Sequence, residues 1–118
     1  MNTRVTPTTD LDKARHDLDV VGYCIVEDVA PSELVGRVRE RVLEQASAER
    51  DTGQAFVQDG NTQWVANVLN KGEVFLELLT CSETGLDLCR HVLGDGFILS
   101  CSNAPIAGPA TGRMKMHS

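Results

Sequence analysis

The sequence predicts an α+β fold in which helices come first and the strands of a sheet follow. Apolar residues recur at helical spacing in two segments of the first half of the chain. Two other segments, 23–29 and 97–104, are rich in the β-branched, aromatic and apolar residues that favour strands. The length of 118 residues and a hydrophobic content of 42% suit one domain at most.

The N-terminal part is predicted to contain a lead-in, a helix and a strand. Residues 1–9 have no apolar core and are expected to be disordered. The helix is expected to lie between Thr9, a suitable N-cap, and Gly22, a suitable C-terminal glycine. Its apolar residues, at helical spacing, are Leu11, Ala14, Leu18 and Val21. The segment 23–29 is then predicted to be a strand buried on both faces.

A second helix is predicted to begin at Pro31 and Ser32 and to end in the polar stretch 49–54. Its apolar stripe consists of Leu34, Val38, Val42 and Ala46. Its alternating arginines are interpreted as a solvated helix face, and they are Arg37, Arg39 and Arg41.

The sequence pattern in the middle of the chain fits two alternative structures. Asp59-Gly60 is a turn signal between two apolar pairs, 56–57 and 64–65, and favours a hairpin. A short helix through 64–69 fits the spacing equally well. After Gly72, a short helix is predicted at 75–79.

The last third is predicted to form one more helix and the clearest strand. Ser82 is the expected N-cap of the helix and Gly94 its end. One face of this helix carries Leu86, Cys89 and Leu93. The strand covers 97–104 and is ended by a turn that contains Pro105, Gly108, Pro109 and Gly112. Residues 113–118 alternate polar and apolar residues, as the start of another strand would.

Composition excludes several classes of function. A net charge of −6 and a pI near 4.9 argue against nucleic acid as a partner, because phosphates require clustered Lys and Arg. No segment has the roughly 18–20 apolar residues that cross a bilayer. We therefore expect a cytoplasmic protein with reduced cysteines, which are Cys24, Cys81, Cys89 and Cys101. Without a short Cys-x-x-Cys pair, buried thiols explain them better than zinc.

Three segments resemble the phytanoyl-CoA dioxygenase family, whose members are iron(II)- and 2-oxoglutarate-dependent oxygenases. The first is Gly22-Tyr23-Cys24-Ile25-Val26-Glu27-Asp28-Val29, followed by Pro31-Ser32-Glu33-Leu34-Val35. The second runs from Trp64 to Phe75 and is followed by Leu78-Leu79. The third runs from Val92 to Ser100 and continues through Gly108-Pro109 to Met116-His117-Ser118. The sequence departs from the family at Val21, where Asp or Asn is common.

This resemblance implies the first strands of a double-stranded β-helix, or jelly-roll barrel, in incomplete form. Residues 10–118 would be the N-terminal portion of a single dioxygenase domain, truncated before the end of its metal motif. Whether the end at Ser118 is natural stays open.

The resemblance also implies roles for five residues. His117 is similar to the first iron ligand of the family's His-x-Asp pair, whose carboxylate would follow Ser118. Asn103 and Leu99 would border the 2-oxoglutarate pocket, and Gln63 and Trp64 would line the substrate entrance. Plainer alternatives stay open. Asn103 could satisfy backbone groups before Pro105, Trp64 could be a core anchor, and His117 could be a frayed terminal residue.

The function implied for the parent is hydroxylation of a small organic or acyl substrate with Fe(II), dioxygen and 2-oxoglutarate. The 118 residues alone are expected to be inactive, because one imidazole cannot replace a set of two His and one carboxylate. Two alternatives are a small non-catalytic interaction domain and a degenerate family member. Beyond a small-molecule substrate, the expected contacts are with further copies of the chain, through unpaired strands.

Overall fold

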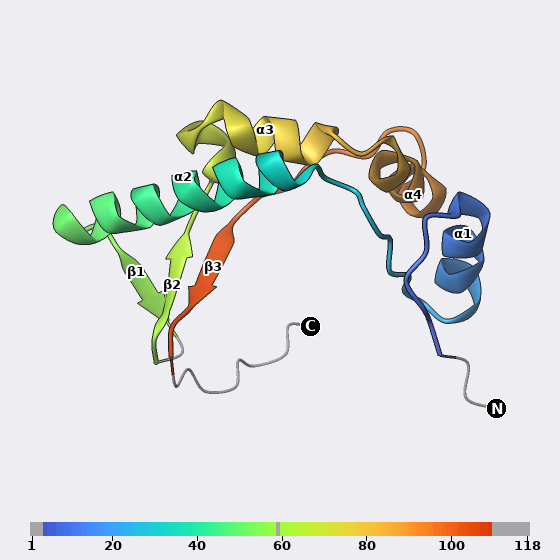
Figure 1. Cartoon of the computed structure of the whole chain (residues 1–118), viewed down its shortest axis with the longest axis horizontal. Helices are drawn as coiled ribbons and strands as arrows, with labels where there is room; N and C mark the ends of the chain where they lie inside the picture. The colour runs from blue at the N-terminus through green and yellow to red at the C-terminus, as the bar shows by residue number, and fades with distance from the viewer. Residues whose placement is uncertain (1–3, 59, 110–118) are drawn as a thin grey trace.

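The computed structural model describes residues 4–58 and 60–109 (Figure 1). Its helices are α1 (Leu11–Val20), α2 (Ser32–Asp51), the short 3-10 helix η1 (Val68–Lys71), α3 (Glu73–Thr80) and α4 (Glu83–Leu93). Its strands are β1 (Phe56–Gln58), β2 (Thr62–Val65) and β3 (Ala104–Ala107). The predicted α+β class is confirmed. Within the described residues the strands make a small antiparallel sheet in the order β1-β2-β3, and no jelly-roll barrel is formed.

One face of the sheet packs against helices, and the other carries Phe56, Trp64 and the fully buried Thr62. Phe56 pairs with Trp64, and Trp64 pairs with Pro105, so these three side chains share a face. Gln63 and Val65 point to the opposite face, where α2 lies. The core forms between this face, α2 and α3, and it consists of Ala46, Val65, Val68 and Phe75. Ala104 and Ile106 of β3 pack against it.

The first helix matches the prediction except at its cap. The side chain of Asp10, not Thr9, accepts hydrogen bonds from the backbone N–H groups of Asp12 and Lys13. Gly22 follows the helix with φ at 97°, a left-handed conformation that glycine adopts without strain. Its N–H donates to the carbonyls of Asp17 and Leu18 and so closes the helix end.

Residues 5–9 differ from the disordered lead-in expected there. Val5 and Thr8 are buried. The Thr8 N–H donates to the Ile25 carbonyl at 2.9 Å, and the Thr8 carbonyl accepts from the Glu27 N–H at 2.9 Å. Lys13 adds a hydrogen bond to the Thr6 carbonyl. These long-range contacts are not visible in local composition, which is why the sequence suggested disorder.

The central elements follow the sequence closely. The predicted helices over α2, α3 and α4 are confirmed, and the apolar stripe of α2 contacts the core through Val38, Val42 and Ala46. Of the two structures left open after residue 55, the hairpin of β1 and β2 is the one that forms. The 3-10 helix η1 begins only after β2 has ended.

The prediction of two long strands, at 23–29 and 97–104, is wrong. Within 23–29 the structure has only an isolated bridge between Val26 and Thr8, and Tyr23 is 51% exposed rather than buried. Residues 97–103 run without regular structure, and Ile98 is 85% exposed. β3 begins at Ala104, where β2 offers a partner, and it includes Pro105, which was expected to follow the strand. A strand needs a neighbour along its length for its backbone hydrogen bonds. Among the described residues, 23–29 has such bonds only with Thr8 and 97–103 only with Val68, which is too little for a strand.

The molecule is extended for its size. Its radius of gyration is 16.7 Å, whereas about 13.5 Å is expected for a compact domain of this length. Figure 1 shows why: α1 and α4 lie at one end of the molecule and the sheet lies at the other. The predicted strand at 113–118 lies outside the described residues. No helix among the described residues is long and apolar enough to cross a membrane.

Candidate functional site

An apolar groove lies between α3, α4 and the chain that follows α4. Its volume is about 540 Å³. It is lined by Val29, Leu69, Leu76, Leu78, Leu79, Thr80, Ser82, Gly85, Leu86, Cys89, Leu93, Phe97, Ile98 and Leu99. None of these residues carries a charge. The groove is therefore suited to an apolar partner rather than to an anion or a cation.

Helical spacing and one capping residue build the walls of the apolar groove. Leu76 and Leu79 lie three residues apart on α3, and Leu86, Cys89 and Leu93 repeat along one face of α4. The hydroxyl of Ser82 accepts a hydrogen bond of 3.0 Å from the Gly85 N–H, which starts α4 directly after α3. The two apolar faces consequently meet at this corner.

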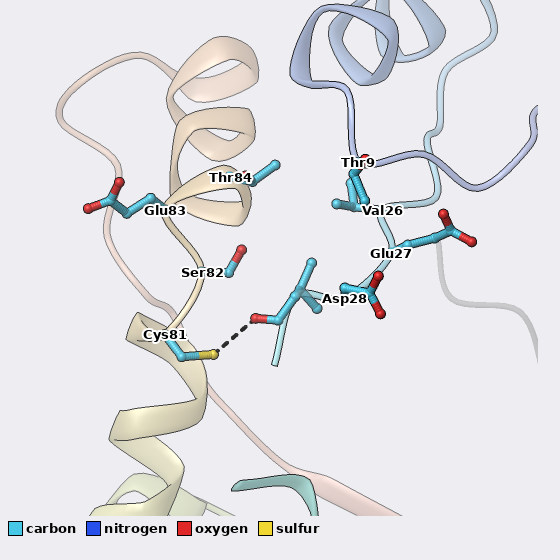
Figure 2. A pocket seen from close by; sticks show the side chains of 9 residues that line it. Thr9, Val26, Glu27, Asp28, Cys81, Ser82, Glu83 and Thr84 are labelled. Carbon is cyan, nitrogen blue, oxygen red and sulfur yellow. Dashed lines mark hydrogen bonds between the residues drawn. The ribbon is translucent and has the colours of Figure 1, made fainter. Parts of the chain in front are cut away.

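A polar hollow of about 490 Å³ adjoins the groove, because Val29 and Ser82 line both (Figure 2). Its remaining lining residues are Thr9, Val26, Glu27, Asp28, Cys81, Glu83 and Thr84. Figure 2 shows the segment 26–28 facing the start of α4 across this hollow. With three carboxylate side chains and no basic residue in the lining, the hollow disfavours anionic ligands.

The thiol of Cys81 holds the two sides of the polar hollow together. It donates to the Val29 carbonyl at 3.3 Å (Figure 2). It also lies 3.2 Å from the Leu78 carbonyl. Asp28, one residue before Val29, has a left-handed φ of 55°, which is uncommon for a residue other than glycine. This cysteine therefore serves as a hydrogen-bond donor between a strained turn and the α3–α4 corner.

Contrary to the expectation of buried thiols, three cysteines are exposed. They are Cys81, Cys89 and Cys101, while Cys24 is partly buried and all four are free. The physical reason is the same as for the two predicted strands. Among the described residues, no apolar layer covers the segments and helix faces that carry these cysteines.

The structure separates the two residues predicted to line a substrate entrance. Gln63 is buried on the covered face of the sheet, where its amide donates to the Ala46 carbonyl at 2.9 Å and accepts from Arg50 at 2.6 Å. Trp64 points to the face away from the helices, where its indole N–H and the hydroxyl of Thr62 are buried and have no hydrogen-bond partner among the described residues. Gln63 thus joins β2 to α2. The predicted substrate role of both residues stays a prediction.

The two residues predicted to border a 2-oxoglutarate pocket make different contacts in the structure. The side-chain oxygen of Asn103 accepts a hydrogen bond of 3.0 Å from the Asn67 N–H, so it stabilises the turn after β2. Asn67 needs this support because it has a left-handed φ of 51°. Leu99 is 52% exposed and lines the apolar groove. Their cosubstrate role stays a prediction.

The predicted iron ligand, His117, lies outside the described residues. Within 4–58 and 60–109, no three His, Cys, Asp or Glu side chains lie close enough together to hold a metal ion. His91 is engaged elsewhere, since its Nε2 lies 2.7 Å from a carboxylate oxygen of Asp19 and joins α4 to α1. The described residues therefore do not offer an iron site by themselves.

Charged contacts support the helices around the groove. Arg37 of α2 donates to Glu77 of α3 at 2.8 Å, and this hydrogen bond, together with the charge of Glu77, raises the pKa of Arg37. Lys71 lies 3.4 Å from Glu49, and both of these side chains are largely buried. These pairs attach α3 and η1 to α2, which fixes the inner wall of the groove.

Sequence reasoning missed the apolar groove, although it found one of its walls. The face of Leu86, Cys89 and Leu93 was recognised from its spacing. An amphipathic face is ordinarily covered, so its exposure could not be inferred from the pattern alone. Comparisons of the chain with protein-family models, with curated proteins and with solved structures found no match.

Proposed function

We propose that this chain is the N-terminal part of an iron(II)- and 2-oxoglutarate-dependent dioxygenase domain of the phytanoyl-CoA dioxygenase type. One observation carries the proposal. The segments 23–29 and 97–103, which have the composition of core strands, lie in the open with Tyr23, Ile98 and Leu99 more than half exposed. Strand-forming segments of this kind are stable when they pair within a larger sheet.

The arrangement of the sheet supports the same proposal. α2 and α3 cover one face of β1-β2-β3, and the opposite face carries the aromatic pair Phe56 and Trp64. Phe56 is 57% exposed. In a jelly roll, one sheet packs face to face on a second sheet and encloses a cavity between them. Trp64, on the face away from the helices, would then border that cavity, whereas Gln63, on the helix-covered face, would not.

The chemistry proposed for the complete domain is hydroxylation of a C–H bond. The substrate and one molecule each of dioxygen and 2-oxoglutarate would give the hydroxylated product, succinate and carbon dioxide. Two His and one carboxylate are the usual ligands for iron(II) in such enzymes. Because the described residues hold no such set, none of them is assigned a step in the reaction.

The coding DNA beyond Ser118 tests the proposal most directly. An acidic residue in the position after Ser118, followed by a barrel's length of strand-rich sequence, is the expected result. The extended protein should convert 2-oxoglutarate to succinate when supplied with iron(II), and His117→Ala should abolish the conversion. A stop codon directly after Ser118 would contradict the proposal. So would an extended protein that folds but leaves 2-oxoglutarate unchanged.

The 118-residue chain provides a second test. It should bind iron(II) only weakly and should not consume 2-oxoglutarate, because His117 would be its sole ligand of the proposed set. Anaerobic titration calorimetry with iron(II) measures this. Stoichiometric binding with a dissociation constant near micromolar would contradict the ligand assignment.

A non-catalytic interaction domain is the second candidate function. The observation in its favour is the uncharged apolar groove of about 540 Å³ beside α4, which resembles a docking surface more than a reaction site. If the coding sequence ends at Ser118, this becomes the better proposal.

A further inference from the structure

We draw no further inference here: the strongest candidate, the apolar groove between α3, α4 and the chain that follows α4, carries none, because nothing among the described residues shows what covers it.

Discussion

Replacing Gln63 by Met should reveal how strongly β2 is joined to α2. The side chain of Gln63 is 7% exposed and makes two hydrogen bonds, one to the Ala46 carbonyl at 2.9 Å and one from Arg50 at 2.6 Å. Met is similar in volume, so the substitution removes both hydrogen bonds without leaving a large cavity. The measured change then reports the hydrogen bonds themselves.

The expected loss of unfolding free energy is about 1.5–2 kcal/mol. A neutral buried hydrogen bond contributes about 1 kcal/mol, and the bond from Arg50 adds less than a fully buried charged bond because Arg50 is exposed. The Ala46 carbonyl is not left unsatisfied, since it lies inside α2 and can keep its helical hydrogen bond.

Urea unfolding followed by the fluorescence of Trp64, the single tryptophan, measures this loss. Gln58→Met is the matched control, because Gln58 lies in the same sheet but is exposed, and its change should stay below about 0.5 kcal/mol. If Gln63→Met is no more destabilising than Gln58→Met, the two hydrogen bonds of Gln63 do not join β2 to α2.

Three further predictions concern the helices. Gly22→Ala should destabilise the fold by about 1 kcal/mol, because φ is positive there, whereas Gly36→Ala inside α2 should stabilise it by about 0.5–1 kcal/mol. Neither added methyl meets another atom within 4 Å, so urea midpoints that shift in the same direction would refute the conformational argument. Ser82→Ala should cost about 1 kcal/mol and should speed hydrogen exchange of the Gly85 amide, and unchanged exchange would mean that the hydroxyl does not cap α4. The contact between Arg37 and Glu77 raises the pKa of Arg37, so its contribution is present at every pH below the ordinary arginine value and is lost only above it. Glu77→Gln should therefore give the same small shift in urea midpoint at about pH 7 and about pH 10, and a shift that differs between these pH values would contradict the assignment.

Elements that depend on local interactions were predicted well. The C-terminal end of α1 and both ends of α4 follow from Gly22, Ser82 and Gly94, whose conformations or side chains act within one helical turn. The hairpin of β1 and β2 was one of two predicted structures, since its turn signal competes with a helical pattern over the same residues. The choice between them depends on β3, which pairs with β2 from about forty residues away.

The candidate site was predicted only in part, because exposure is not a local property. The spacing of Leu86, Cys89 and Leu93 identifies an apolar face but not whether another layer covers it. Asn103 and Gln63 are polar residues next to strands, and their composition suits a ligand contact as well as an internal hydrogen bond. Only the positions of Asn67 and Ala46 show that internal partners exist.

The sequence by itself determined which segments are helical, where they end and which of their faces are apolar, because caps, glycines and side-chain periodicity act over a few residues. Only the tertiary structure decided which apolar segments become strands, since a strand exists only beside a partner, and that partner is often far away in the chain. In this protein β2 supplies a partner to Ala104–Ala107, whereas 23–29 and 97–103 make backbone hydrogen bonds with only one residue each, Thr8 and Val68, among the described residues. That difference in pairing leaves Tyr23, Ile98 and Leu99 exposed, which is the observation that carries the proposed function.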